Sequence, residues 1–295
     1  MQSIQVEADR KWVQSELGAT FDGFCSRWRD KESSKESSKE SGKESINEGS
    51  LETNIQACRR LLIGDQALGW LHGLAQTRVL AGFQDMGIRC NTEGTVQIPL
   101  SDAQATLTEL GVWLHSRRWV PTWRDELQTV HNLNGEPLFD LERGMFKMLG
   151  LRSQAVHIHI ETPDGLVWLG KRSLHKKENP GMLDNLSAGG LGAGETPWSC
   201  VWRELDEEAG LMPNQVDLKL ARDPILVSRP VGIGWHHETI HLFKGIVPRN
   251  WTPKNRDGEV LCFELTTRSA CVNAVNQWRF TPDAGLVTAL LLTNP

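Results

Sequence analysis

The chain has 295 residues, of which 39% are hydrophobic and 23% charged, and its net charge at pH 7 is −5, as in ordinary globular proteins of one or two domains. The acidic balance argues against nucleic-acid binding, which needs a basic surface, and no apolar run approaches the length of about 18 residues that spans a membrane. Six scattered cysteines without a CxxC pair, together with acidic first residues and no apolar signal core, lead us to expect a cytoplasmic protein with reduced thiols.

Two segments are expected before the first globular domain. Residues 1–30 contain a stripe of apolar side chains at helical spacing, which predicts an N-terminal helical segment that docks on the rest of the protein. Residues 31–50 begin with a KES repeat of balanced charge that is rich in serine. Such a segment has little to bury, so we expect a disordered linker, with a helix of alternating Glu and Lys as the alternative.

A smaller α+β domain is expected over residues 51–150. The sequence VQIPL at residues 96–100 alternates as a strand does. Ser101 and Gln104 then have the spacing of a capping box, which predicts the start of a helix at this point. The apolar positions of that helix are Leu107, Leu110 and Leu114.

A second helix of this domain is predicted from the sequence LERGMFKML. Asp140 is placed to cap its start, and Gly150 suits the left-handed residue that follows a helix. No chemical motif occurs in this part of the chain. We therefore expect its carboxylates and its histidines His115 and His131 to be ordinary surface groups.

Residues 151–295 have the pattern of a mixed sheet flanked by helices. Alternating residues 155–161, the turn signal Pro-Asp-Gly, and residues 166–172 predict a hairpin. A glycine-rich loop and a helical segment follow. Three further strands and a closing helix are expected at residues 224–229, 238–247, 259–265 and 282–292.

The helical segment lies within residues 189–211, GGLGAGETPWSCVWRELDEEAGL. Thr196 suits the N-cap and Pro197 the first helical position, and Gly210 ends the helix. We therefore expect a helix from Pro197 to Ala209. The side chains expected to bury one side of it are Trp198, Val201 and Leu205.

The opposite side of this helix collects negative charge. Glu204, Glu207 and Glu208 lie at i, i+3 and i+4, so their carboxylates project together although they repel. Three such oxygens suit Mg²⁺ or Mn²⁺, which shares its remaining ligands with substrate phosphates and waters. Arg203 lies beside this face and can bridge to Glu195 or to a ligand.

The register of the whole segment is more specific than its charge. The fixed positions are Gly189, Glu195, Arg203, Glu204, Leu205, Glu207, Glu208, Gly210 and Leu211. A solvated acidic helix explains the carboxylates but not this register, which arises by chance in well under about one chain in a million. The segment resembles the box of the Nudix hydrolases at every fixed position. The resemblance implies an α/β fold, the Nudix α/β/α sandwich with a mixed sheet, and metal-dependent cleavage of an organic diphosphate.

The same resemblance implies roles for individual residues. Glu207 and Glu208 are the expected direct metal ligands, and Glu204 is either a ligand or the general base. Arg203 orients Glu204, Glu195 supports the water shell of the metal, and the carbonyl of Gly189 is a further ligand. Outside the box, Glu259 matches a position at which many members place another ligand or base, and an exposed glutamate at a strand start is the alternative.

Further segments resemble the Nudix group related to thiamine pyrophosphokinase, in which a domain of uncharacterised type precedes the Nudix domain. The quoted segments are LLIGDQALGWL, WRDELQTVHN, LERGMFKMLG, KRS, PGMLDNLSAGG, DGEV and FTPDAGLVTALLL, so the likeness covers roughly residues 52–295. It implies hydrolysis of thiamine diphosphate, or of a damaged analogue, to the monophosphate and phosphate. The expected partner is therefore a small-molecule diphosphate.

Three residues are the expected substrate-binding set. Lys171 and Arg172 end the second hairpin strand near the glycine-rich loop and can hold phosphates, although a basic pair facing water is the alternative. Trp235, or Trp168 in its place, offers an aromatic face to a cationic or flat ring. The neighbouring pair of histidines in GIGWHHET, His236 and His237, is expected to face solvent, with a contact to a substrate phosphate as the alternative.

Other functions remain open from the sequence. A Nudix hydrolase of ADP-ribose or another nucleoside diphosphate derivative has the same box. Isopentenyl-diphosphate isomerase shares the fold but needs a catalytic cysteine and a different acidic set, so the complete hydrolase box counts against it. A non-catalytic ligand-binding Nudix module is expected to show a degenerate box, and this box is intact.

Overall fold

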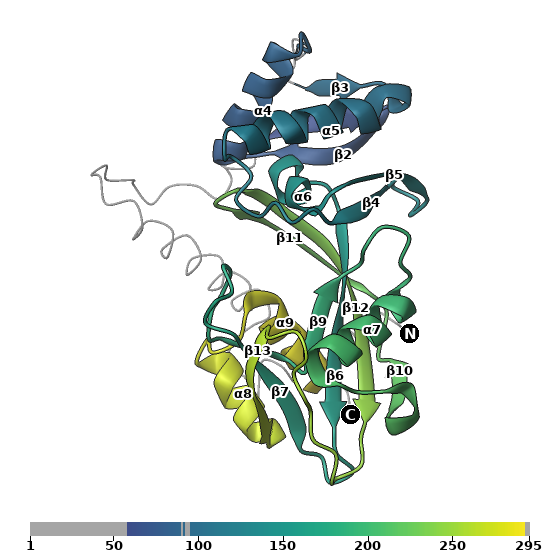
Figure 1. The fold of residues 1–295 in the computed structure, drawn as a ribbon, viewed down its shortest axis with the longest axis vertical. Coiled ribbons are helices and arrows are strands. Elements are labelled where there is room, and N and C mark those ends of the chain that lie inside the picture. The colour runs from purple at the N-terminus through teal and green to yellow at the C-terminus, as the bar shows by residue number, and fades with distance from the viewer. Residues whose placement is uncertain (1–57, 90, 92–94, 293–295) are drawn as a thin grey trace, which may run out of the picture.

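A computed structural model of the protein describes residues 58–89, 91 and 95–292 (Figure 1). The expected N-terminal helical segment and the linker, residues 1–30 and 31–50, lie outside the described residues. The strands are β1 (Arg59–Ile63), β2 (Gln66–Leu71), β3 (Val96–Ile98), β4 (Leu127–His131), β5 (Pro137–Glu142), β6 (Ser153–Glu161), β7 (Val167–Arg172), β8 (Leu183–Asn185), β9 (Ser187–Gly190), β10 (Asp217–Leu220), β11 (Ile225–Val231), β12 (Gly234–Ile246) and β13 (Val260–Thr266). The helices are α4 (Gly73–Asp85), α5 (Leu100–Ser116), α6 (Arg143–Leu149), α7 (Pro197–Glu204), α8 (Arg268–Asn276) and α9 (Pro282–Leu292), with short helical turns η1 (Leu205–Ala209) and η2 (Pro213–Gln215).

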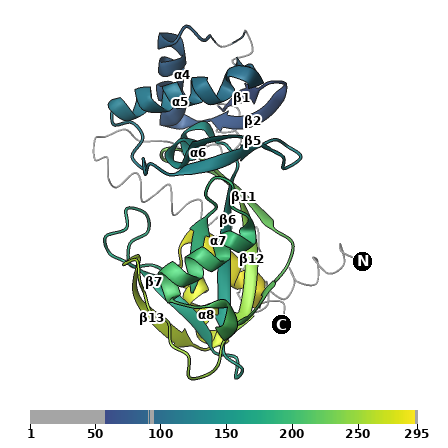
Figure 2. The ribbon, with the colours of Figure 1, turned by 45° about the vertical axis from the view of Figure 1, so that its right-hand side comes forward.

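The described chain forms two lobes that lie one above the other in Figures 1 and 2. The leading lobe, residues 58–150, contains a three-stranded sheet in the order β2-β1-β3 and the separate β4-β5 hairpin. The C-terminal lobe, residues 151–292, contains an eight-stranded sheet. None of the described helices is long and apolar enough to cross a membrane.

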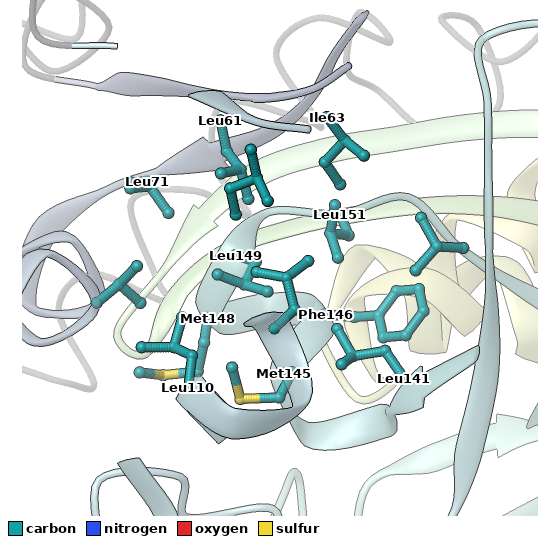
Figure 3. Packing of buried hydrophobic residues seen from close by; sticks show 14 of the residues in the cluster. Leu61, Ile63, Leu71, Leu110, Leu141, Met145, Phe146, Met148, Leu149 and Leu151 are labelled. Carbon is teal, nitrogen blue, oxygen red and sulfur yellow. The ribbon is translucent and has the colours of Figure 1, made fainter. Parts of the chain in front are cut away.

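Helix α6 is the centre of the leading lobe's core (Figure 3). Met145, Met148 and Leu149 are fully buried among leucines from the strands and from α5. Gly150 ends the helix in the left-handed conformation, at φ 61°, as predicted. The predicted cap is wrong, because Glu142 rather than Asp140 accepts the N–H of Gly144 at the helix start.

The reason for this difference is that the strand before α6 is longer than the sequence indicates. Asp140 lies within β5, where its carboxylate accepts a hydrogen bond from Thr129 Oγ1 at 2.7 Å. Glu142 is only 6% exposed, so the expectation that this lobe's carboxylates are all surface groups is also wrong. His131 is half-buried as well.

The predicted capping box at Ser101 is not formed. Helix α5 begins two residues earlier than a cap at Ser101 would place it, at Leu100 with Pro99 as its N-cap, and the Ser101 hydroxyl donates to Asp102 instead. Proline pre-sets the backbone at this corner, so the chain enters the helix before Ser101 can act as the cap. The predicted apolar face is confirmed, since Leu107, Leu110 and Leu114 are completely buried.

The sheet of the C-terminal lobe is mixed, as predicted, with helices on both faces. β12 runs parallel to β6, whereas β7 and β9 run antiparallel to it. Neighbouring residues of β12 point to opposite faces: Phe243 packs in one core with Val201 of α7, and Leu242 packs in another with Val287 of α9. The predicted hairpin is confirmed by the pairing of β6 with β7, and the closing helix α9 has the predicted bounds.

Candidate active site

Helix α7 starts as its sequence predicts. Thr196 Oγ1 accepts the N–H of Ser199 at 3.1 Å, and Pro197 occupies the first turn, where a missing N–H costs nothing. The α-helix ends at Glu204, and the next five residues form the wider π-turn η1, which stops at Gly210 with φ 62°. The expected span to Ala209 is therefore correct in length, but its last turn is a π-turn, a form often found at functional sites.

The inner side of α7 is narrower than predicted. Val201 and Leu205 are fully buried together with Cys200, which completes this part of the core. Trp198, by contrast, is 44% exposed. Its indole packs edge-on against Phe243 at 4.8 Å between ring centroids, so only part of the side chain is covered.

The three glutamates of the helix face are not equivalent in the structure. Glu204 and Glu208 are each only 8% exposed, whereas the side chain of Glu207 is 48% exposed. The carboxylate of Glu204 lies directly against Gly189, so closely that a Cβ at this glycine would collide with it. Glu208 points deeper and accepts the backbone N–H of Ala188 at 3.0 Å. Strand β9 thus fixes both buried carboxylates, and Gly189 is required by close approach.

Arg203 connects the start of the segment to its glutamates. Its Nε donates to Glu195 Oε1 at 2.7 Å and its Nη1 to Glu204 Oε1 at 2.6 Å. A longer contact of 3.3 Å reaches Glu207. The predicted bridge to Glu195 is confirmed. The hydrogen bonds from Arg203 also hold the pKa of Glu195 below its usual range, so Glu195 is charged and fixes the guanidinium that positions Glu204.

A second acidic segment, directly before β13, meets Glu208 and is hydrogen-bonded to η1 through its backbone. One ligand-type oxygen each from Glu208, Asp257 and Glu259 lies within 4.8 Å of the others. Glu259 was expected here, but Asp257 was not, although it lies in the quoted DGEV segment. Glu204 and Glu207 lie outside this three-residue group, which forms only because the segment before β13 folds back over η1.

Among the described residues, no side chain supplies a counter-charge to Glu208 within ion-pair distance. Burial, together with the nearby Glu204 carboxylate, raises the pKa of Glu208 to about 8. Burial also raises the pKa of Glu204 and that of Asp257. Among the described residues no side-chain cation forms an ion pair with Glu208, while Lys176 pairs with the more exposed Glu259. A buried carboxylate without a cation is unfavourable unless a ligand supplies the charge.

These residues fit the divalent metal that the sequence indicates. Every candidate donor is a hard carboxylate oxygen, which Mg²⁺ and Mn²⁺ prefer over the softer ligands of zinc sites. Glu208 supplies a buried, uncompensated oxygen, and Asp257, Glu259 and the exposed Glu207 lie toward the open side. Mg²⁺ keeps several waters when bound, so a site open on one side suits it.

The acidic groups open into a cleft of about 1070 Å³ between the two lobes. Its acidic wall comes from α7, η1 and the segment before β13. Apart from Arg203 of α7, its Arg and Lys side chains come from two other places, the end of β7 with the segment after it and the leading lobe. Those residues are Arg124, Arg143, Arg172, Lys176 and Lys177. A cleft of this size accommodates a small organic ligand.

A comparison with known protein families agrees with this geometry. The family model described as NUDIX domain matches residues 151–283, which include α7, η1 and the acidic segment before β13. The chain belongs to the Nudix family. The region that matches the family model begins directly after the leading lobe, so residues 58–150 lie outside the matched region.

Three curated relatives define the neighbourhood of this Nudix protein. Nudix hydrolase 24, chloroplastic, from Arabidopsis thaliana is 28% identical over 234 residues, which cover 76% of this chain and 63% of the relative. Nudix hydrolase 20, chloroplastic, from the same plant is 32% identical over 166 residues, covering 55% and 44%. The isopentenyl-diphosphate Delta-isomerase of Jannaschia sp. is 31% identical over 149 residues, covering 50% and 76%. The chain thus spans less than two thirds of the length of the two plant hydrolases.

The structure separates the three substrate-binding residues expected of the Nudix protein. Arg172 lines the cleft and donates to Asp184 at 3.0 Å. Lys171 lines a small adjoining cavity beside Glu208 instead. Trp235 is not among the residues that line the cleft, because β12 carries it toward the leading lobe, where its Nε1 donates to Ser228 and its ring packs edge-on against His72. The expectation for Trp235 is therefore wrong.

The alternative tryptophan and the histidine pair are also placed differently than expected. Trp168 is 9% exposed and packs edge-on against Trp251 in the core. His236 is only 5% exposed and lies 3.2 Å from Asp283, and His237 is half-buried. The prediction that both histidines face solvent is wrong, because alternation along β12 turns His236 into the sheet's covered face.

Sequence reasoning missed the contribution of the leading lobe to the cleft. Trp123, Arg124, Gln128 and Arg143 all line it. The segment WRDELQTVHN has a family resemblance, yet nothing in its spacing shows that it meets a segment about 70 residues later in the chain. The one local signal was the concentration of Trp, Arg, Glu and Gln in a short stretch that ends in a strand.

Proposed function

We propose that this Nudix protein is a divalent-metal-dependent diphosphatase that hydrolyses an organic diphosphate, with thiamine diphosphate or its damaged analogues as the preferred substrates. The observation that supports it most is the buried carboxylate of Glu208, which has no ion-pair partner among the described residues. It lines a small cavity that adjoins a cleft holding several arginines and lysines. The carboxylates suit a cation, and the cationic side chains suit the phosphates that would be bound beside it.

In the proposed reaction a water oxygen bonds to one phosphorus of the substrate. The bond between that phosphorus and the bridging oxygen breaks, and the bridging oxygen leaves on the other phosphate. A bound Mg²⁺ or Mn²⁺ would neutralise diphosphate oxygens and lower the pKa of a bound water. Glu207, Glu208 and Glu259, with Asp257 beside them, would hold that ion.

Glu204 is the proposed base that receives the water's proton. It is buried, its pKa is raised by burial, and Arg203 fixes one of its oxygens at 2.6 Å. A raised carboxylate pKa brings a general base closer to neutral pH, where its proton affinity is most useful. Glu259 is the other candidate base, and its exposed side chain beside Lys176 favours a ligand role.

The proposal of a thiamine substrate rests on the segments that resemble the Nudix group related to thiamine pyrophosphokinase, and the cleft is compatible with this substrate. Its walls combine carboxylates for a metal, cations for phosphates and an indole, Trp123, for a flat cationic ring. ADP-ribose and other nucleoside diphosphate derivatives have the same diphosphate group. They are therefore the direct competitors in any test of this proposal.

Isomerase chemistry is less compatible with the cleft. The isomerases of this fold need a catalytic cysteine, and none of the four cysteines within the described residues lines the cleft. Cys200 comes nearest, but it is completely buried, and burial raises its thiol pKa to about 12. A thiol of that kind is a poor acid or nucleophile.

The test is a phosphate-release screen of the purified 295-residue chain with Mg²⁺ or Mn²⁺. The substrates are thiamine diphosphate, its oxidised analogues, ADP-ribose and dinucleotides, with coupled phosphatase for products that retain the phosphate. Turnover of the thiamine compounds with the highest kcat/KM is expected. Activity on nucleotides alone would reject the thiamine reading, and no activity with any metal would favour a ligand-binding module.

Two variants locate the reaction in the box. Glu207→Gln removes one charge from the exposed side of the proposed site, and we expect kcat/KM to fall by about 100-fold, because a carboxylate ligand of the ion is lost. Glu109→Gln, an exposed glutamate of α5 outside the cleft, is the matched control and keeps full activity. Retained turnover in both Glu207→Gln and Glu208→Gln would refute the metal-site assignment.

A further inference from the structure

The leading lobe forms one wall of the cleft, although it lies outside the matched Nudix region. Residues of β4 and of the segment that leads into it, and the first residue of α6, face the cleft from this side. The side chains concerned are Trp123, Arg124, Glu126, Gln128 and Arg143. Because the acidic wall belongs to the other lobe, a ligand in the cleft would touch both.

Hydrogen bonds fasten this wall to the glycine-rich part of the box. The N–H of Ala193 donates to the carbonyl of Leu127 at 2.8 Å, and the N–H of Gly194 donates to Thr129 Oγ1 at 3.2 Å. On the other side of the cleft, Lys177 Nζ donates to the carbonyl of Pro121 at 3.1 Å. The wall is thus held in place from both sides, which is what a pre-organised binding surface needs.

The two arginines of the wall are positioned by one buried carboxylate. Glu142 Oε1 accepts the N–H of Arg124 at 3.0 Å and the N–H of Gly144, next to Arg143, at 3.1 Å. The guanidinium of Arg143 lies over the box strand, with Nη2 3.2 Å from the point that a Cβ on Gly190 would occupy. Gly190 directly follows Gly189, which touches Glu204.

Arg143 has a partner that a bound anion would compete with. Its Nη1 lies 2.8 Å from Glu126 Oε2, and the two side chains are 35% and 51% exposed. Exposed ion pairs of this kind are weak. A diphosphate at the same place offers several oxygens to the planar guanidinium and would outcompete a single exposed carboxylate.

Trp123 is the aromatic side chain of the wall. The ring of His115 stacks on the indole of Trp123, with 4.3 Å between the centroids and 27° between the planes. The indole Nε1 of Trp123 donates a hydrogen bond to Asp125 at 2.7 Å. These contacts fix the indole beside the cleft. An indole held in this way binds a flat or cationic ring at little entropic cost.

We propose that the leading lobe is part of the substrate site, with Arg124 and Arg143 binding the diphosphate and Trp123 holding the organic ring. That the bound diphosphate is a substrate rests on the proposed function, whereas the binding of a diphosphate by the leading lobe does not depend on it. It assigns the leading lobe a task that the Nudix lobe cannot perform alone, namely the choice of the organic group. Trp123 takes the place that sequence analysis gave to Trp235.

The diphosphate part is tested by calorimetric binding of methylenediphosphonate, a non-hydrolysable diphosphate, to the full chain with Mg²⁺. Arg143→Gln is expected to weaken binding by about 10- to 100-fold, because a charge-assisted hydrogen bond is lost. Glu126→Gln is expected to bind at least as tightly as the wild type, since it removes the competing carboxylate. Arg117→Gln, on the same lobe but outside the cleft, is the control and binds unchanged.

Opposite signs for Arg143→Gln and Glu126→Gln distinguish binding from structure. If the Arg143–Glu126 pair only stabilised the lobe, both variants would weaken binding equally, and that result would overturn the proposal. Unchanged binding in Arg143→Gln, or no binding by the wild type, would overturn it as well. Binding is measured without turnover, so a protein that binds in this pattern but hydrolyses nothing would refute the proposed function and leave the inference standing.

The ring part is tested by Trp123→Leu. We expect KM for thiamine diphosphate to rise by about 2- to 30-fold, from the loss of the aromatic contact, with kcat little changed. The Kd of methylenediphosphonate, which has no ring, should stay at the wild-type value. Equal losses for both ligands would indicate a distorted wall rather than a ring site, and an unchanged KM would also reject the assignment of Trp123.

Discussion

Within the described residues two groups of three side chains each place ligand-type atoms within 4.8 Å of one another, and only one of them has the electrostatics of a metal site. The first group is Glu208, Asp257 and Glu259, at the edge of the cleft: Asp257 and Glu259 line the cleft, and Glu208 lines the small cavity beside it. The second is His236, Glu238 and Asp283, where β12 meets the start of α9. By distance alone the two are equally suitable for an ion.

The second group already contains its cation. Arg229 donates two hydrogen bonds to Asp283, at 2.8 and 3.3 Å, and His236 lies 3.2 Å away. Ser153 donates to Glu238 at 2.8 Å. Although burial alone would raise it, Arg229 and His236 hold the pKa of Asp283 well below its usual range.

In the cleft group the shift has the opposite sign, since the pKa of Glu208 is raised to about 8 by burial and by Glu204. A lowered carboxylate pKa means that the protein itself supplies the compensating charge. A raised carboxylate pKa means that the compensating positive charge must come from a ligand, or that the carboxylate takes up a proton. The contrast teaches that the direction of the pKa shift, rather than the gathering of ligands, separates a candidate metal site from an internal ion pair.

The largest effect is expected from Glu208→Gln. Because this carboxylate is the buried ligand in the proposed site, kcat/KM should fall by about 1000-fold, equivalent to the several kcal/mol that a catalytic ion contributes. Mg²⁺ should raise the Tm of the wild type and leave that of the variant unchanged. Phosphate release and a thermal melt with and without Mg²⁺ measure both, and a Mg²⁺-dependent Tm shift that survives in the variant would contradict the assignment.

Asp283→Asn is expected to affect stability rather than activity. It leaves Arg229 and His236 without their carboxylate, and breaking a largely buried pair of this kind costs about 2–3 kcal/mol. Since the folded pKa of Asp283 is depressed, its stabilisation is present above its ordinary pKa and is lost as pH falls through the folded value. The Tm difference between wild type and variant should therefore shrink in acid. An unaltered Mg²⁺-dependent Tm shift in this variant would confirm that the second group is no metal site, and its loss would contradict the distinction.

A smaller effect is expected in the pH dependence of the stability of the metal-free protein. The folded pKa of Glu208 is raised above its ordinary value of 4.5, so its contribution to stability is intact below pH 4.5 and is lost as pH rises toward 8. Between pH 6 and 8 the loss is at most about 1.4 kcal/mol for each pH unit. Thermal melts of the wild type in a chelator should show it. The loss should be absent in Glu208→Gln, and a wild-type Tm that rises over this range would contradict it.

The sequence was sufficient for the box and insufficient for its surroundings. Thr196 and Gly210 set the ends of the helical segment through local capping, which spacing alone predicts. The π-turn of η1 and the meeting of Asp257 with Glu208 depend on contacts between segments about 50 residues apart, which spacing does not contain. For the same reason Trp235 was expected in the cleft: alternation predicts the face of a strand, but not which end of the sheet borders the cleft.

The leading lobe illustrates the same limit at its helix starts. Ser101 and Asp140 have suitable chemistry for capping, yet Pro99 and Glu142 take these positions, because the helix starts two residues earlier in one case and two residues later in the other. Arg124 and Arg143 are 19 positions apart, in a part of the chain that has no chemical motif. Only the fold, through Glu142, brings them to one wall of the cleft.

The smallest expected effect comes from the helix caps and compares the two sides of the C-terminal sheet. Thr196 caps α7, and Thr267 caps α8 by accepting the N–H of Ala270 at 3.2 Å. Replacing either with Ala should lower stability by about 1 kcal/mol, or about 2–4 °C in Tm. Neither change should reduce the Mg²⁺-dependent rise in Tm, because Glu208 lies three turns beyond the α7 cap and is fixed by its own hydrogen bond to Ala188. A rise that disappears in Thr196→Ala but not in Thr267→Ala would instead mean that the cap, and not β9, positions the buried carboxylate.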